Sequence, residues 1–441
     1  RIAPELGRTF SPDDDVPGAP ATVILGHSLW TERYGADERR TSGVGGGSAA
    51  RNLLVVAETA LGVIVLLGAG LLLRSFVQLA SVPLGFQPDR VLSFRVILPA
   101  SRYDTLAKRS AFYRAVAEKL DALPGVRSAS AISFLPLTMS GRTSGINIEG
   151  EPPPGPGMVR FVDFRTVIPG YFATMNIPMV RGRDLAWSDT PDRLPSVIVS
   201  QTAARSFWPN EDAVGKRLKL SRRDSDPWLT VVGVVGNVQQ LDLVNQPRPA
   251  VYLPSTQDSQ TGETLRDWVI RAAGDPTAQA AAARNAVWSI DPTLPVTRVQ
   301  TMSNVRSASL ASGQFNVLVA GLFAALALVL SAVGLYGVTS YAVSQRTREL
   351  GIRMALGAGR SDVLKLVVSS GLRLVLFGLA IGFVAALFLT GLMSALLFGI
   401  GAHDPVTFVA VAAVLIAVSL TACYIPAWRA SRVDPLLALR T

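Results

Sequence analysis

The chain has 441 residues, of which 49% are hydrophobic and only 17% are charged, and its mean hydropathy is +0.34. Soluble domains usually carry about 25% charged residues, so this composition excludes an ordinary soluble protein. The net charge of +10 would also suit nucleic-acid binding, but much of the basic excess flanks long apolar runs, as in membrane proteins. A single cysteine, Cys423, and two histidines, His27 and His403, do not make a structural zinc site.

Four apolar runs are each long enough to cross a bilayer as a helix. A hydrocarbon core of about 30 Å needs about 20 helical residues, and buried helices of soluble proteins are rarely this long without charge. The runs cover residues 53–73, 315–343, 367–398 and 406–425, the third softened by Arg373. We therefore predict four transmembrane helices, over residues 51–76, 313–344, 366–398 and 406–427.

The positions of lysine and arginine orient these helices. Basic residues precede the first run, crowd the link between the second and third runs and follow the fourth, whereas residues 399–405 contain none. Cytoplasmic segments carry the excess of Lys and Arg, so we expect both termini, residues 345–365 and the tail 428–441 to be cytoplasmic. The insert 77–312 and the loop 399–405 should then be extracytoplasmic. Arg74 opposes this rule, but a long side chain at a helix end can reach the interface.

The insert alternates between short strands and helices, and it is large enough to hold its own core. Strands are predicted over residues 91–98, 126–134, 159–168, 196–199, 228–235 and 268–272. One helix is predicted over 105–123 with Asp104 as its N-cap, and another over 276–290 with Asp275 as N-cap and Pro276 in the first position. The predicted fold class is a membrane protein with about four transmembrane α-helices and a large α+β extracytoplasmic domain between the first and second.

The sequence contains no enzyme signature that indicates a reaction. It lacks a G-x-x-x-x-G-K-[ST] phosphate loop, a G-x-S-x-G elbow and an H-E-x-x-H motif. We expect no catalytic residue, no directly bound cofactor or metal, and no nucleic-acid partner. Glu58 lies inside the first apolar run, where an acidic side chain is costly and often functional. The alternative is that Glu58 sits near the interface or contacts a neighbouring helix.

Residues 345–359 follow the second predicted span directly. Arginines at positions 346, 353 and 360 recur at helical multiples, and Ile352 and Leu356 form an apolar pair. This pattern predicts a short amphipathic helix along the membrane face. Two interpretations remain open, a basic interfacial helix held by anionic lipid and a docking element for a cytoplasmic partner.

Two segments resemble the signature of the FtsX-type permeases of MacB-like ABC transporters. One runs from Arg348 to Ala358 (Arg-Glu-Leu-Gly-Ile-Arg-Met-Ala-Leu-Gly-Ala), and the other is the tail 426–440, which begins Pro-Ala-Trp-Arg-Ala-Ser-Arg. The insert carries weaker echoes of the same family at Pro169-Gly170-Tyr171-Phe172, at Gly182-Arg183 and at 231–235. The resemblance covers about residues 51 to 441.

The resemblance implies a permease that performs no ATP chemistry itself. It implies a separate or fused ABC-type ATPase that uses ATP and Mg, a second permease copy or paralogue, contact with membrane lipid, and a place in the bacterial cytoplasmic (inner) membrane. The helix near residues 346–359 would contact the ATPase. The candidate coupling residues are Arg346, Arg348, Glu349, Gly351, Ile352, Arg353, Leu356 and Gly357.

The implied function is export, or lipoprotein or peptide handling, by mechanical transmission to the extracytoplasmic domain. The alternative is an FtsX-like transmembrane regulator of an extracytoplasmic cell-wall hydrolase. A membrane-bound enzyme is a third hypothesis, which the lack of a catalytic constellation opposes.

The first residues resemble part of the insert. Gly7-Arg8-Thr9-Phe10, followed by Val23-Ile24-Leu25, matches Gly182-Arg183-Asp184-Leu185 and Val197-Ile198-Val199 with a one-residue gap. We therefore expect residues 1–50 to be the remnant of a preceding extracytoplasmic domain plus a Gly-rich linker. The chain would then resemble the C-terminal half of a duplicated orphan permease that has lost intervening helices, and the lack of a signal peptide fits such a fragment.

Overall fold

The structure is a computed structural model that describes residues 39–138, 141–152, 159–220, 226–257, 264–346, 352–354, 359–393 and 397–430. The predicted remnant at residues 1–38 therefore lies outside the described residues. The chain divides into two compact units. A helical unit comprises the chain up to Gly68, Leu322–Leu392 and the part from His403, and an α/β unit comprises Ala69–Gly321 and Met393–Ala402.

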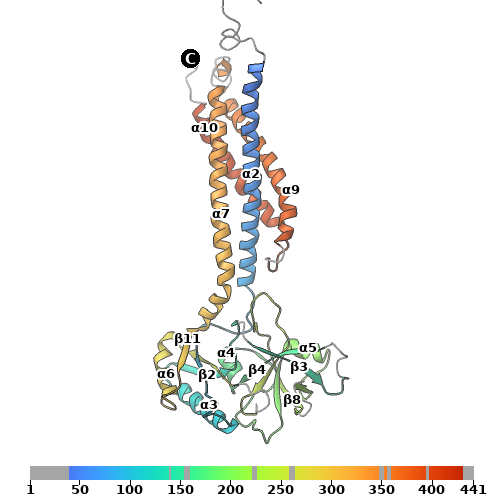
Figure 1. The fold of residues 1–441 in the computed structure, drawn as a ribbon, viewed down its shortest axis with the longest axis vertical. Helices are drawn as coiled ribbons and strands as arrows, with labels where there is room; N and C mark the ends of the chain where they lie inside the picture. Colours follow the sequence, from blue (N-terminus) through green and yellow to red (C-terminus); the bar gives the residue numbers. More distant parts are fainter. Residues whose placement is uncertain are drawn as a thin grey trace, which may run out of the picture. The chain divides into compact units, whose positions relative to one another are not determined.

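Four long helices are α2 (Arg39–Ala80), α7 (Met302–Gln345), α9 (Arg360–Leu392) and α10 (Pro405–Ala430) (Figure 1). All four are long and apolar enough to cross a membrane, which confirms the predicted spans. The bounds differ at several ends. Helix α2 extends beyond the predicted 51–76 at both ends, so the predicted Gly-rich linker before residue 51 is helical from Arg39. Helix α7 begins at Met302, well before residue 313, because the Thr301 hydroxyl caps it by accepting from the Asn304 N–H at 3.1 Å. Helix α9 ends at Leu392, so its predicted extension to Phe398 is wrong; the Phe398 N–H donates instead to the Ser75 hydroxyl at 2.8 Å.

The core of the helical unit draws residues from all four helices. It contains Val55, Val63, Leu67, Leu335, Val375, Leu379, Ala386, Val411, Leu415, Ala422 and Cys423. Glycines allow close approach of α9 to α2. A Cβ added at Gly378 would lie 2.6 Å from Thr59 Cβ, and one at Gly382 would lie 2.7 Å from Val63 Cβ. Small residues at helix contacts are typical of membrane bundles, where packing replaces the hydrophobic effect as the driving force.

The α/β unit is built on eleven strands and short helices. The strands are β1 (Val91–Val96), β2 (Val126–Ile132), β3 (Arg142–Ile148), β4 (Phe161–Val167), β5 (Met179–Gly182), β6 (Ser196–Ser200), β7 (Arg217–Leu220), β8 (Leu229–Val235), β9 (Ala250–Pro254), β10 (Asp267–Ala272) and β11 (Val296–Thr301). The helices are α3 (Leu106–Asp121), α4 (Tyr171–Met175), α5 (Gln201–Phe207), the 3-10 helix η2 (Pro276–Gln279) and α6 (Ala280–Trp288).

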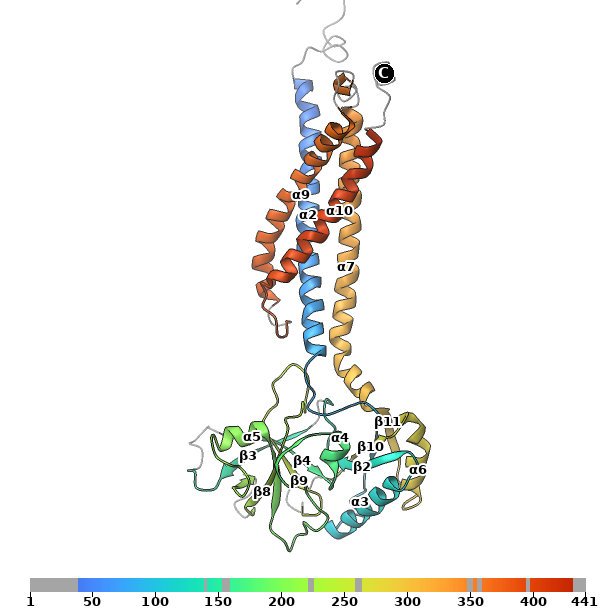
Figure 2. The same cartoon turned by 180° about the vertical axis from the view of Figure 1, so that it is seen from behind.

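The sheet has two parts. Strands β11, β1, β10 and β2 form an antiparallel part whose one face packs against α3 and α6, which lie beside β2 and β11 in both views (Figures 1 and 2). Strands β4, β3, β7, β8, β6 and β9 follow in order, and β9 pairs back onto β4, so these six strands form a closed ring. All six contribute to one apolar core with α5. Closure removes exposed strand edges from this part of the sheet.

The helix caps of the α/β unit test two predictions. Asp275 caps the segment that begins at Pro276 by accepting from the Thr277 N–H at 2.9 Å, as predicted. The prediction for α3 is wrong by one residue, because Thr105 and not Asp104 accepts from the Lys108 N–H. The Asp104 side chain forms an ion pair with the Lys108 ammonium at 2.8 Å instead.

Candidate functional site

The link between α7 and α9 contains three described coupling residues. Arg346 directly follows α7 and donates its N–H to the Val343 carbonyl at 3.1 Å. Ile352 and Arg353 lie in a short helical piece, residues 352–354, and both side chains are exposed. The other predicted coupling residues, Arg348, Glu349, Gly351, Leu356 and Gly357, lie outside the described residues.

Helix α9 includes the last six residues of the predicted cytoplasmic segment 345–365. It starts at Arg360, so residues 360–365 belong to this long helix and not to a separate one. The Asp362 carboxylate accepts from the Gly359 N–H at 3.1 Å at this start. The coupling role of the link stays a prediction.

The last turns of α7 carry two tyrosines that sequence reasoning missed. The Arg429 guanidinium of α10 donates to the Tyr336 hydroxyl at 3.1 Å. The Arg51 guanidinium of α2 lies 3.9 Å from the centroid of the Tyr341 ring, within cation–π range, and Gln345 donates to the Tyr341 hydroxyl at 2.8 Å. These contacts join α2 and α10 to the end of α7, directly before the link that carries the candidate coupling residues.

Glu58 lies on α2 against a glycine of α7. Its side chain is half-buried, and a Cβ added at Gly334 would lie 2.2 Å from one carboxylate oxygen. The neighbouring Ser331 hydroxyl is buried without a hydrogen-bond partner in the described part of the chain. Gly334 therefore makes room for an acidic side chain at a helix contact inside the helical unit. A functional role for Glu58 stays a prediction.

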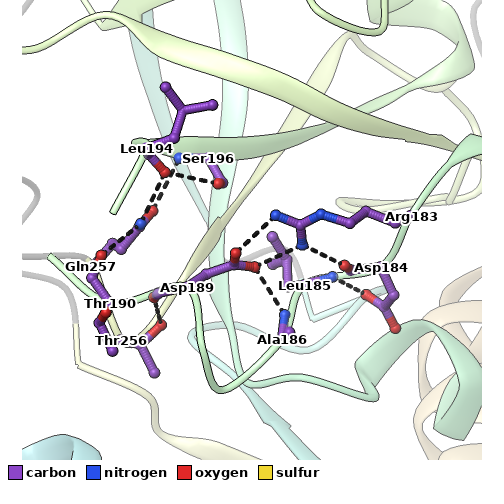
Figure 3. Close-up of polar contacts among 10 residues, drawn as sticks. All are labelled: Arg183, Asp184, Leu185, Ala186, Asp189, Thr190, Leu194, Ser196, Thr256 and Gln257. Carbon is purple, nitrogen blue, oxygen red and sulfur yellow. Dashed lines mark hydrogen bonds and ion pairs between the residues drawn. The ribbon is translucent and has the colours of Figure 1, made fainter. Parts of the chain in front are cut away.

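A polar network fixes the loop between β5 and β6 in the α/β unit (Figure 3). The Arg183 guanidinium donates to both oxygens of the Asp189 carboxylate, at 2.7 and 2.9 Å, and the Ala186 N–H donates to the same carboxylate at 2.9 Å. Burial of this carboxylate acts to raise its pKa, but the hydrogen bonds from Arg183 and Ala186 outweigh burial and hold the pKa of Asp189 below its usual range. The weak sequence motif at Gly182-Arg183 therefore lies at the end of β5 and the start of a loop that hydrogen bonds hold in place.

The chain after β9 holds the other side of this loop. The Thr256 hydroxyl donates to the Asp189 carbonyl, and the Gln257 amide donates to the carbonyls of Thr190 and Leu194 at 2.9 and 3.0 Å (Figure 3). These bonds tie the backbone of the β5–β6 loop to the chain after β9. Among the residues that the structure describes, no group of three or more His, Cys, Asp or Glu side chains could hold a metal ion.

These features define a multi-pass membrane protein with an α/β domain of the periplasmic type. A family model, the MacB-like periplasmic core domain, matches residues 53–288, and a second, the FtsX-like permease C-terminal region, matches residues 321–435. The chain belongs to this family of MacB-like proteins with an FtsX-like permease region, as its motifs predicted.

Several curated relatives are similar to the chain over part of its length. The macrolide export ATP-binding/permease protein MacB of Mannheimia succiniciproducens is 22% identical over 280 residues, which cover 61% of this chain and 42% of that protein. MacB of Hahella chejuensis is 25% identical over 285 residues, covering 63% and 43%. MacB of Brucella abortus is 33% identical over 143 residues, covering 32% and 22%. The chain therefore spans less than half the length of these relatives.

Two solved structures are also similar to the chain. The periplasmic region of MacB from Actinobacillus actinomycetemcomitans has 13% identity and a TM-score of 0.35, and the match covers 51% of this chain and 94% of that one. The extracellular domain of the ABC-type transporter YknZ from Gram-positive bacteria has 12% identity and a TM-score of 0.32, covering 47% and 100%.

Proposed function

We propose that the chain is the permease subunit of an ABC transporter, in which a separate ATPase hydrolyses ATP with Mg and thereby moves the α/β domain. The observation that carries this proposal is a pair of exposed arginines, Arg346 and Arg353, at described positions between α7 and α9, directly after a membrane-length helix. The family match to the FtsX-like permease region over residues 321–435 supports it, because that match includes the link.

The proposed mechanism is mechanical transmission. The chain passes from the helical unit to the α/β unit inside two helices, α2 between Gly68 and Ala69 and α7 between Gly321 and Leu322. A shift of either helix on ATP binding would bias the α/β unit between two states. A second permease copy or a paralogue would complete the transporter. The proposed function is export, or the handling of lipoproteins or peptides.

The proposed orientation places both termini and the link in the cytoplasm and the α/β unit outside. The native thiol, Cys423, is only 1% exposed, so cysteines introduced at Val244 and Ile352, which are 56% and 44% exposed, report separately. With a membrane-impermeant maleimide we expect Val244→Cys to react in intact spheroplasts and Ile352→Cys to react only in inverted vesicles. The unmodified chain is the control for reaction at Cys423. Reaction of both variants from one side, or the reverse pattern, would contradict the proposed orientation and with it the coupling to a cytoplasmic ATPase.

A further inference from the structure

The α/β unit contains a cleft of about 430 Å³ between α3 and the loop after β5. One wall is a face of α3 and the other is the loop fixed by Arg183 and Asp189, closed by a residue that follows β9. The lining residues are Leu106, Ala107, Ser110, Ala111 and Arg114 on α3, with Trp187, Thr190, Pro191 and Thr256 opposite. Sites for small organic molecules usually have volumes of about 300–1,000 Å³ and combine apolar walls with a few polar groups.

Three polar groups of the cleft have no hydrogen-bond partner in the described chain. The Ser110 hydroxyl is shielded from solvent and unpaired. The Arg114 guanidinium forms no ion pair and lies 5.0 Å from the centroid of the Trp187 ring. The Trp187 indole N–H also has no acceptor, although the ring packs against the core of the antiparallel part of the sheet. Arginine and indole are donors only, so together these groups favour a ligand that accepts hydrogen bonds.

The charge of the cleft is positive. No carboxylate lines it, and two acidic side chains of the neighbouring loop, Asp184 and Asp189, accept hydrogen bonds from other groups. Asp184 accepts from the Leu185 N–H, and Asp189 accepts from Arg183 and Ala186. Arg114 is therefore the charged group of the lining, and the apolar surface beside it comes from Leu106, the alanines of α3, Pro191 and the Trp187 ring.

The walls of the cleft are held before any ligand binds. The Thr256 and Gln257 side chains fix the backbone of Asp189, Thr190 and Leu194, so the loop that presents Trp187 is anchored on both sides (Figure 3). Helix α3 is fixed by its buried face, which includes Phe112, Val116 and Leu120. A site whose walls are ordered in advance loses little conformational entropy on binding.

We propose that this cleft binds a small organic anion. Its acid group accepts hydrogen bonds from the Arg114 guanidinium, and its apolar or aromatic body lies against Trp187 and Leu106. The site goes beyond the proposed permease function and does not depend on an ATPase.

The test uses the full chain in lipid nanodiscs, with 2-naphthoate as the probe and its neutral isostere 2-naphthamide as the control ligand. We expect titration calorimetry to show saturable binding of 2-naphthoate that weakens with rising salt, as binding of an anion to an exposed cation should. Arg114→Gln should weaken binding about tenfold or more, because it removes a charge-assisted hydrogen bond. The matched control is Arg205→Gln, which removes the same charge from an exposed arginine of α5 outside the cleft and should leave binding unchanged.

A second variant tests the location without altering charge. Ala111 is exposed on α3 and lines the cleft, so Ala111→Trp should fill the space and abolish binding while the protein stays folded. The proposal is overturned if the unmodified chain shows no saturable binding, if the amide binds as tightly as the acid, or if folded Arg114→Gln and Ala111→Trp both bind like the unmodified chain. These outcomes are distinguishable from a failure of the permease proposal, since no ATPase is present.

Discussion

Reversing the charge of Arg353 should abolish the effect of this chain on the ATP turnover of its partner ATPase. Arg353 is exposed in the helical piece between α7 and α9, where an acidic surface of a cytoplasmic partner could approach it. A like-charge contact at an interface costs several kcal/mol, so Arg353→Glu should weaken the complex at least about tenfold. Turnover of the purified ATPase, measured with increasing amounts of each variant in nanodiscs, reads out this loss.

The matched control for Arg353→Glu is Arg205→Glu. Arg205 is likewise exposed, but it lies on α5 in the α/β unit, far along the chain from the link. It should leave both turnover and complex formation unchanged. If folded Arg353→Glu stimulated the ATPase as strongly as the unmodified chain does, the link between α7 and α9 would not be a coupling element.

Alanine at Gly378 or Gly382 should destabilise the helical unit, although alanine favours helix formation. The added Cβ at Gly378 would lie 2.9 Å from Thr59 Cγ2 and 3.0 Å from the Val56 carbonyl oxygen, and the one at Gly382 would lie 2.9 Å from a backbone carbonyl oxygen of α2. Backbone atoms cannot turn aside, so α2 and α9 must separate. Such overpacking typically costs about 1–3 kcal/mol. We expect a lower midpoint of thermal unfolding in detergent, followed by the helical circular dichroism signal.

The same substitution at Gly391 is the control. Gly391 also lies in α9, but a Cβ added there meets nothing within 4 Å. Gly391→Ala should therefore be neutral or stabilise the helix by up to about 1 kcal/mol through helix propensity alone. Equal effects of alanine at Gly378 and Gly391 would show that the close contact between α2 and α9 does not govern stability.

The four membrane spans could be predicted because length and apolar composition alone identify a membrane helix. The helix contacts were not, since Gly378, Gly382 and Gly334 have no sequence pattern that identifies their partners on α2. The ends of α7 and α9 were also misplaced. The Thr301 and Ser75 hydroxyls accept from the backbone N–H groups of Asn304 and Phe398, and a hydrophobicity pattern does not predict such hydrogen bonds.

Six strands of the α/β unit, namely β1, β2, β4, β6, β8 and β10, were predicted from the sequence. Strands β3, β5, β7, β9 and β11 were missed. They are short or polar, such as Arg217–Leu220, or they end at a proline, as β9 does at Pro254. Their place is fixed by pairing with distant segments, as in the parallel pair of β9 with β4 that closes the ring. Tertiary context of this kind overrides local propensity.

The candidate sites also differ in whether the sequence could identify them. The link between α7 and α9 was identified from a contiguous motif, and its neighbours Tyr336 and Tyr341 were missed because their partners lie on other helices. The cleft was equally invisible to sequence reasoning, since Arg114 and Trp187 meet only after α3 and the β5–β6 loop have packed. Functional residues that are contiguous in the sequence can be identified from a motif. Residues that come together only in the folded chain cannot.

The most direct test of the permease assignment is the ATP turnover of the ABC-type ATPase encoded nearest to this chain, purified alone and together with the chain in nanodiscs. We expect the two proteins to co-purify and the turnover rate of the complex to differ from that of the ATPase alone. An ATPase that neither co-purifies with the chain nor changes its turnover in the chain's presence, repeated for every ABC-type ATPase of the same cell, would contradict the account.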